Sequence, residues 1–366
     1  MLVIADFLSI NYLAIIKVIE KFYEDKSSTG GTMKESNKAN NKRSSKGFKR
    51  ILSAFAFTVV IALALVLGYG YHTLSSVSHD NLEDKDLGIQ EESFTENDGI
   101  INILLMGIDS RAKDFTGRSD AMMILTIDPV HDKLKLTSLM RDSYVEIEGF
   151  GYDKLTHAYA YGQGYLAVKT VNTNFGLNIE DYVVVDFSGL ETMVDQLGGI
   201  NITLTEEEIS PLNTNIEEQS RLHNKEADYI YEPGSHHMNG LQAVAYARIR
   251  KTSGGDYQRT ERQREVLEKM LYKLKDSDIT TFVSLVKNML PYVKTSLGSS
   301  EIISLGTKVF TSDINTIEQK RFPLDDYSYG GFANNRWHLM YDVEPTKEQL
   351  YAYLFEDIAP EEGAVD

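Results

Sequence analysis

The segment INILLMGI, residues 101–108, is an almost unbroken apolar run, and AMMILTI follows it at 121–127. Apolar runs of this length are typical of strands that are covered on both faces of a sheet. KLKLTSL at 133–139 instead alternates polar and apolar residues, and it follows the turn DPVHDK. YVVVDF at 182–187 and INITLT at 200–205 have the same strand character. These segments predict a β-sheet built around residues 101–139.

Helical segments alternate with these strands. LAVKTVNTNFG at 166–176 ends in a glycine, and SGLETMVDQLGG at 188–199 ends at Gly198 and Gly199, as helices commonly do. Strands that alternate with helices indicate an α/β domain. We therefore predict a central mixed β-sheet flanked by helices.

Composition excludes several classes of function. The 366-residue chain has a formal net charge of −17, which disfavours general affinity for nucleic acid backbones. It has no cysteine, so thiol catalysis, thiolate metal sites and disulfides are excluded.

One apolar segment predicts a membrane anchor. ILSAFAFTVVIALALVLGYGY, residues 51–71, has no charged side chain and is about long enough to span a bilayer. Residues 34–50 are strongly basic, whereas residues 80–98 are acidic. Because the positive flank stays inside, we predict a single transmembrane helix with the C-terminal domain outside the cell membrane. A cleaved signal peptide is the alternative.

The remaining boundaries follow from this segment. Residues 1–50 are predicted to be a basic cytoplasmic tail, although Met33 is a second possible start. Residues 72–98 are interpreted as an acidic linker, 99–358 as the extracellular catalytic domain, and 359–366 as an acidic tail.

An antiparallel arrangement of the first three strands would bring charged residues to one sheet edge. The first strand ends before Asp109, and the second begins near Asp120, so both lie at the same end of the sheet. The third strand returns to that end. The residues gathered there would be Asp109, Arg111, Arg118, Asp120, Arg141 and Asp142.

A basic helix start adds to this cluster. In GGDYQRTERQREVLEKML, residues 254–271, Arg259 and Gln263 stand at the head of the apolar stripe Leu267, Leu271 and Leu274. Burying an unpaired guanidinium is unfavourable, so we expect Arg259 to bind a phosphate that arrives with the substrate. Asp256 is predicted to be the N-cap. Arg262 is expected beside Arg259, and Arg264 in solvent.

Arg248 and Arg250, in the RIR of YARIRK, complete the set of arginines. Clustered arginines in an acidic chain favour an anion with many oxygens, such as a pyrophosphate. The alternative is that Asp109 and Asp120 form ordinary surface salt bridges with Arg111 and Arg118.

The chain also resembles the LytR-CpsA-Psr family. The resemblance covers seven ordered motifs between residues 102 and 267, and more loosely EQKRFP at 318–323. The motifs are NILLMGIDSR, GRSDAMMILTID, SLMRDSYVEIEG, DKLTHAYAYG, VVVDFSGLETMVDQLGGI, MNGLQAVAYARIRK and DYQRTERQREVL.

The resemblance implies a phosphotransferase. Such an enzyme would move a glycopolymer, such as wall teichoic acid or a capsular polysaccharide, from undecaprenyl pyrophosphate to a sugar hydroxyl of peptidoglycan. An apolar tunnel between sheet and helices would hold the polyprenyl tail. The departures from the family pattern are Met140, where proline is usual, and Gln163, where a second glycine is usual.

The resemblance also implies roles for individual residues. Asp109 and Asp120 would hold Mg²⁺ and, with Arg141, would form the catalytic set. The pyrophosphate would be bound by Arg118, Arg141, Arg250, Arg259 and Gln263. Secondary candidates are Arg111, Asp142 (as a general base), Arg248 and Arg262. Two other functions fit the same arginines: a regulatory protein that only binds lipid-linked pyrophosphate, and a polyprenyl-pyrophosphate pyrophosphatase.

Overall fold

The computed structural model describes residues 78–90, 99–109, 115–312, 314 and 316–360. The predicted basic tail at 1–50, the predicted transmembrane segment at 51–71 and Arg111 lie outside these residues. Among the described residues, no helix has both the length and the apolar character that a membrane crossing requires.

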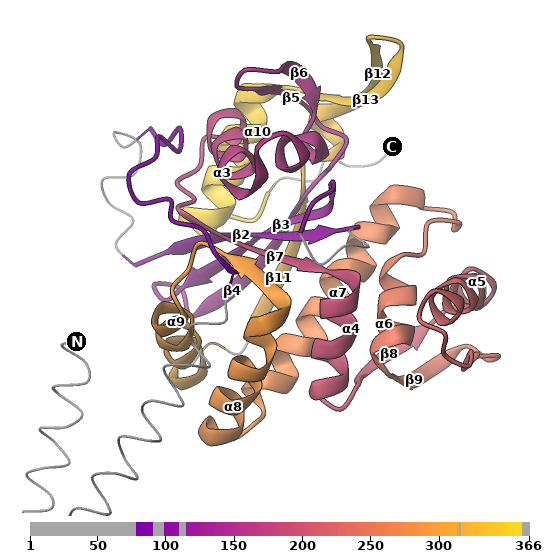
Figure 1. The fold of residues 1–366 in the computed structure, drawn as a ribbon. Coiled ribbons are helices and arrows are strands. Elements are labelled where there is room, and N and C mark those ends of the chain that lie inside the picture. Colours follow the sequence, from indigo (N-terminus) through magenta and orange to yellow (C-terminus); the bar gives the residue numbers. More distant parts are fainter. Residues whose placement is uncertain (1–77, 91–98, 110–114, 313, 315, 361–366) are drawn as a thin grey trace, which may run out of the picture. The chain divides into compact units, whose positions relative to one another are not determined.

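A seven-stranded mixed sheet forms the centre of the domain (Figure 1). In spatial order its strands are β1 (Ser78–His79), β10 (Val293–Thr295), β7 (Asp181–Asp186), β2 (Ile101–Ile108), β3 (Ser119–Asp128), β4 (Lys133–Leu139) and β11 (Thr316–Phe322). β2, β3 and β4 form the predicted antiparallel meander. β7 runs parallel to β2, and β11 runs parallel to β4. The predicted fold class, a mixed sheet in an α/β domain, is confirmed.

Helices cover both faces of this sheet. They are α3 (Thr156–Phe175), α4 (Phe187–Gln196), α5 (Glu206–Leu222), α6 (Gly240–Ala247), α7 (Gly255–Lys275), α8 (Ile279–Met289), α9 (Ser299–Thr311) and α10 (Val343–Phe355). Leu104 and Met106 of β2 pack into the core formed with α3 and α10. Ile103, on the opposite face, packs towards α9. The continuous apolar character of 101–108 arises because both faces are buried.

The strand predicted at 200–205 does not join the central sheet. β8 (Ile200–Leu204) pairs instead with β9 (Gly234–Met238) in a separate two-stranded sheet. Its alternate residues Ile200, Ile202 and Leu204 are buried in a second core with α4, α5, α6 and α7. Two further hairpins project from the domain: β5 (Tyr144–Ile147) with β6 (Gly151–Lys154), and β12 (Ser328–Ala333) with β13 (Arg336–Tyr341).

The interval interpreted as a linker is partly integrated into the fold. Within residues 72–98, β1 adds a strand beside β10, and Leu82 is buried in the main core. Asp86 binds the ammonium group of Lys169 at 2.9 Å, so an acid of this interval meets a basic group on the domain surface. Acidic composition alone did not reveal this, because the partner lies on a distant helix.

Candidate functional site

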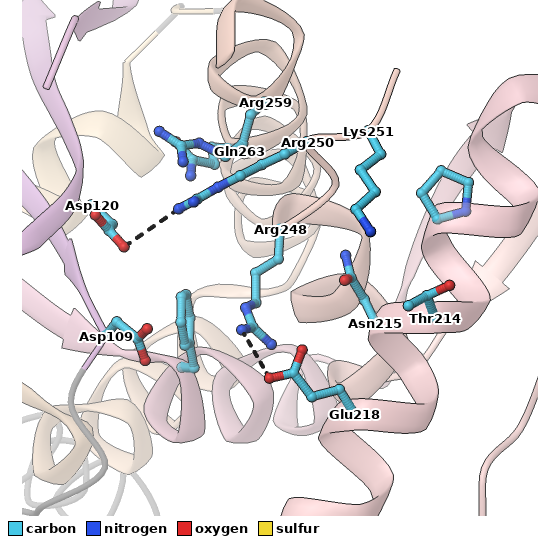
Figure 2. A pocket seen from close by; sticks show the side chains of 12 residues that line it. Asp109, Asp120, Thr214, Asn215, Glu218, Arg248, Arg250, Lys251, Arg259 and Gln263 are labelled. Carbon is cyan, nitrogen blue, oxygen red and sulfur yellow. Dashed lines mark ion pairs between the residues drawn. The ribbon is translucent and has the colours of Figure 1, made fainter. Parts of the chain in front are cut away.

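A polar cavity of about 330 Å³ lies at the sheet edge predicted from the meander (Figure 2). The end of β2, the start of β3, α4, α5, the α6–α7 connection and α7 all contribute to it. Its lining residues are Asp109, Asp120, Phe187, Pro211, Thr214, Asn215, Glu218, Arg248, Arg250, Lys251, Arg259 and Gln263. The cavity thus collects Asp109, Asp120, Arg248, Arg250, Arg259 and Gln263 from the predicted set.

The meander brings the two aspartates to this cavity. Ile108 at the end of β2 pairs with Ser119 at the start of β3, so Asp109 and Asp120 flank the same register position. A shift in register between Gly107 and Ile108 accompanies the end of the ladder. The placement follows from strand pairing, which the apolar pattern of 101–108 and 121–127 already determines.

Two arginines contact the carboxylate of Asp120. Arg141 donates a hydrogen bond from Nη1 to Asp120 Oδ1, and Arg250 Nη2 lies 3.6 Å from Asp120 Oδ2. Arg141 Nε also lies 3.4 Å from Asp256 and 3.6 Å from Asp142. Burial alone would lower the pKa of Arg141, but these carboxylates outweigh it, so its pKa lies above its ordinary value. Arg141 therefore connects the carboxylates of Asp120, Asp142 and Asp256 through ion pairs.

Arg259 has unused hydrogen-bonding capacity. Its residue exposure is 1%, and Nη2 donates to Asp256 Oδ2 at 2.7 Å. Nε and Nη1 are buried without a hydrogen-bond partner among the described residues. Burial, with the neighbouring charge of Arg141, lowers the pKa of Arg259 to about 10. Buried donors are nearly always paired, so this guanidinium is arranged for a ligand.

Two other residues of the cavity also have a buried polar atom without a hydrogen-bond partner among the described residues. Gln263, one turn along α7 from Arg259, has a buried Oε1 without a partner in the described part of the chain. Arg248 Nη1 also has none there. The guanidinium of Arg248 lies 5.0 Å from the ring centroid of Phe187 and 3.7 Å from Glu218 Oε1. Sequence reasoning missed Lys251, Phe187 and Glu218, although Lys251 directly follows the RIR motif.

The N-terminus of α7 differs from the prediction. The helix begins after Gly254, and Asp256 lies within the first turn instead of serving as N-cap. From there its carboxylate contacts both Arg259 and Arg141. The stripe Leu267, Leu271 and Leu274 is half-buried, while Val266 and Met270 are the buried apolar residues.

Other predicted residues lie outside the cavity lining. Arg118 is exposed. Arg262 is buried but donates from Nε to Glu208 Oε1 at 2.7 Å, forming an internal ion pair with α5. Asp142 contacts Lys154 at 2.6 Å through Oδ1, and Arg141 through Oδ2. Both oxygens of Asp142 are thus engaged, which argues against its assignment as a general base.

The prediction that Arg264 is solvated is wrong. Its residue exposure is 6%, and it donates to Ser138 Oγ at 2.8 Å and to Gln319 Oε1 at 3.2 Å. Burial lowers its pKa to about 10. The helix turns this side chain towards β4 and β11, and no local pattern in 254–271 indicated that neighbour.

Asp109 and Asp120 fit a metal that arrives with a phosphate. The described residues contain no group of three or more side chains able to hold a metal by themselves. Mg²⁺ commonly takes one or two carboxylates and completes its shell with water and substrate phosphates. Two aspartates in a cavity beside arginine donors that lack partners in the described part of the chain match that requirement.

An apolar cavity of about 260 Å³ lies between the sheet and α7, α8 and α9. Its lining includes Ile103, Leu125, Leu271 and Leu274. Arg259 and Leu271 lie 12 residues apart on α7, which is about 18 Å along a helix. One helix therefore lines the polar cavity with its N-terminal part and the apolar cavity with its C-terminal part.

Fold and cavities define an α/β domain that can hold an anionic headgroup beside an apolar chain. The chain belongs to the LytR_cpsA_psr family, whose family model matches residues 66–351. This confirms the resemblance seen in the seven motifs.

Two relatives and one solved structure illustrate the similarity. The polyisoprenyl-teichoic acid–peptidoglycan teichoic acid transferase TagT of Bacillus subtilis (strain 168) is 29% identical over 305 residues, which cover 81% of this chain and 91% of TagT. The regulatory protein MsrR of Staphylococcus aureus (strain COL) is 31% identical over 234 residues, which cover 63% of this chain and 67% of MsrR. A structure of YwtF (TagT) with bound octaprenyl pyrophosphate lipid has a TM-score of 0.53 and 25% identity, covering 76% of this chain and 96% of that one.

Proposed function

We propose that this chain is a membrane-anchored phosphotransferase. It transfers a glycopolymer, such as wall teichoic acid or a capsular polysaccharide, from a polyprenyl pyrophosphate carrier to a sugar hydroxyl of peptidoglycan. The similarity to TagT, which is named as a transferase of teichoic acid between a polyisoprenyl-linked form and peptidoglycan, supports the assignment.

One observation carries the proposal: Arg259 is buried in a cavity lined by further arginines, and two of its donors have no partner among the residues that the structure describes. A pyrophosphate offers enough oxygens to use those donors, and guanidinium groups bind phosphate oxygens in a two-pronged geometry. The apolar cavity at the other end of α7 suits the prenyl chain of the same ligand. The pyrophosphate and the prenyl chain of one lipid would thus bind in two cavities that α7 lines at its two ends.

The chemistry requires positioning and neutralised charge more than a covalent intermediate. The acceptor hydroxyl forms a bond to the phosphorus that bears the polymer and loses its proton. The bond between that phosphorus and the bridging oxygen breaks, polyprenyl phosphate leaves with the bridging oxygen, and the hydroxyl proton passes to solvent. Arg259, Arg248 and Arg250 line the cavity where they neutralise the negative charge that moves onto the leaving phosphate.

We infer that Asp109 and Asp120 hold Mg²⁺ together with the pyrophosphate. The bound ion would supply additional positive charge on the phosphate oxygens. Asp120 must then share its carboxylate with a cation that competes with Arg250, whose contact at 3.6 Å is the longer of its two arginine contacts.

Membrane anchoring through residues 51–71 remains a proposal, supported by the basic flank at 34–50 and the acidic one at 80–98. Protease added to intact protoplasts should digest the domain that follows residue 98. A domain that stays protected while the N-terminal tail is cut would show the opposite orientation.

A transfer assay tests the proposed function directly. The full chain is incubated with a synthetic lipid-pyrophosphate-linked sugar and peptidoglycan oligomers, with Mg²⁺ present or chelated. We expect the sugar phosphate to appear on the oligomers only with Mg²⁺. Release of sugar phosphate to water alone would indicate a pyrophosphatase. Lipid binding with no turnover would indicate the regulatory binding protein.

A further inference from the structure

Exposed aromatic rings lie on α3, on the β5–β6 hairpin that packs against it and on the β12–β13 hairpin that contacts β5. The aromatic surface consists of Phe150, Tyr152, Tyr161, Phe332 and Trp337, from the β5–β6 hairpin, α3 and the β12–β13 hairpin. Phe332 is 78% exposed and Phe150 56%. Exposed apolar groups that cluster in this way usually mark an interaction site.

Several of these rings are held in fixed positions. Phe150 and Tyr161 stack with centroids 4.4 Å apart and an interplanar angle of 10°. Trp337 crosses the backbone at Gly330, where a Cβ atom would lie 2.9 Å from the indole Nε1. Phe332 faces Trp337 directly across the hairpin. Gly330 therefore permits the indole to lie against the hairpin with 43% of Trp337 still exposed.

The aromatic surface is connected to the catalytic cavity by a short series of contacts. Asp120 accepts a hydrogen bond from Arg141, and Arg141 lies 3.6 Å from Asp142. Asp142 binds Lys154 at 2.6 Å, and the Lys154 ammonium lies 5.6 Å from the centroid of the Trp337 ring. The backbone NH of Leu339 also donates to the carbonyl of Asp142 at 2.9 Å. The hairpin that carries Trp337 is thus fastened to the residue next to Arg141.

Polar groups border the rings. Tyr161 donates its hydroxyl to Asp153 Oδ2 at 2.7 Å, and His157 Nδ1 lies 2.8 Å from the same oxygen. Burial would raise the pKa of Asp153, but the hydrogen bonds from the Tyr161 hydroxyl and the Lys154 N–H, with the nearby His157 ring, outweigh it and hold the pKa below its ordinary value. The surface thus combines apolar ring faces with hydrogen-bonding groups beside them. This combination suits a ligand that has both C–H faces and hydroxyl groups.

We propose that the aromatic surface binds sugar rings of the acceptor glycan and thereby presents its hydroxyl to the cavity. This rests on the proposed function, for which it names the acceptor-binding residues. Pyranose rings present axial C–H groups, which pack on the negative face of an aromatic ring. Their hydroxyls then reach the polar border formed by Asp153, Lys154 and the Tyr161 hydroxyl.

A membrane surface is the competing occupant for exposed aromatics. The fold argues against it. Helices α8 and α9 line the apolar cavity proposed for the lipid tail, and Figure 1 shows the β12–β13 hairpin at the opposite end of the domain from them. A lipid that enters between α8 and α9 leaves the hairpin on the side away from the lipid entry.

The single tryptophan of the chain makes the proposal directly testable. The full chain is placed in lipid nanodiscs, and Trp337 fluorescence is followed while uncrosslinked glycan strands of N-acetylglucosamine and N-acetylmuramic acid are added. We expect a saturable change that Phe332→Ala weakens about tenfold, the effect of losing one aromatic stacking contact. Tyr231→Ala, which removes an equally exposed ring in the loop before β9, should leave the titration unchanged. No response to glycan, or quenching of Trp337 by brominated acyl chains in the nanodisc, would overturn the proposal.

Turnover separates this proposal from the function on which it rests. In the transfer assay, Trp337→Ala should raise the acceptor KM by about tenfold and leave binding of lipid pyrophosphate unchanged, while Trp337→Phe should retain most of the acceptor affinity. An unchanged acceptor KM in Trp337→Ala would overturn the glycan site while transfer itself stands. A wild-type chain that binds glycan but transfers nothing would refute the transferase and leave the binding surface intact.

Discussion

Replacing Arg259 by methionine should make the ligand-free protein more stable and the protein less able to bind its substrate. Methionine keeps an unbranched stem but removes the guanidinium. In the ligand-free protein Nε and Nη1 are buried without partners in the described residues, and only Nη2 is paired, with Asp256. The two effects therefore have opposite signs, which a structural ion pair would not produce.

The magnitudes follow from these contacts. Each buried donor without a partner destabilises the folded state by about 1–3 kcal/mol. The contact with Asp256, which is partly exposed, contributes about 0–1 kcal/mol. We expect the free energy of unfolding to rise by at least about 1 kcal/mol, or at least roughly 2 °C in Tm for a domain of this size. Loss of two charge-assisted hydrogen bonds to phosphate, about 1.5–3 kcal/mol each, should weaken lipid pyrophosphate binding by at least about 100-fold.

The assay combines thermal unfolding of the full chain in detergent with a titration of octaprenyl pyrophosphate. Arg264→Met is the matched control, because Arg264 is also a buried arginine on the same helix. Its donors are paired with Ser138 and Gln319. We expect that control to lose stability and to keep its lipid affinity. A fall in Tm for Arg259→Met of the same size as for Arg264→Met, with lipid affinity changed less than about threefold, would refute the reasoning.

Three further outcomes test other parts of the site. Asp109→Asn or Asp120→Asn should each reduce Mg²⁺-dependent transfer by about 100-fold or more, with the double variant little worse, because residues that act as a unit are non-additive in kinetic assays. Arg262→Met should lower the free energy of unfolding by about 3–5 kcal/mol in denaturant titrations, because it strands the buried carboxylate of Glu208, and it should spare lipid binding. The hydrogen bonds from Thr205 and Arg262 outweigh burial and hold the pKa of Glu208 below its ordinary value. The stability from this pair should therefore be present above the unfolded-state pKa near 4.3 and be lost as pH falls through the lower folded-state pKa, and Glu208→Gln should flatten that part of the pH profile.

Local patterns predicted the meander because β2, β3 and β4 follow one another and each buries its apolar run. Strand β11 was not predicted, since its partner β4 lies about 180 residues earlier and its own sequence carries little apolar character. The β12–β13 hairpin had a usable signal. Asn334 and Asn335 both have positive φ, 52° and 58°, as a two-residue turn between paired strands requires.

The arginines of α7 show why the site itself was only partly predictable. Helical spacing placed Arg259 and Gln263 on one face, which the structure brings to the cavity. The same spacing predicted Arg262 beside Arg259 and Arg264 in solvent, but it could not show that both bind internal partners, Glu208 on α5 and Ser138 on β4. Those partners come from distant parts of the chain, and the T-x-x-E capping box at 205–208 was the sole local hint of a fixed carboxylate.

The carboxylate of Asp120 offsets part of the positive charge that the arginines bring to the cavity. It is shared by Arg141 and Arg250, so the like charges of these arginines are offset inside the protein. A pyrophosphate carries more negative charge than one carboxylate and competes for the same donors. Arg250 is 51% exposed at its side chain, and its contact at 3.6 Å is the longer one, whereas Arg141 is also held by Asp142 and Asp256. We therefore expect Arg250 to turn from Asp120 to the phosphate while Arg141 stays in place. A lipid-bound structure in which Arg141 has left Asp120 and Arg250 still holds it would contradict this order.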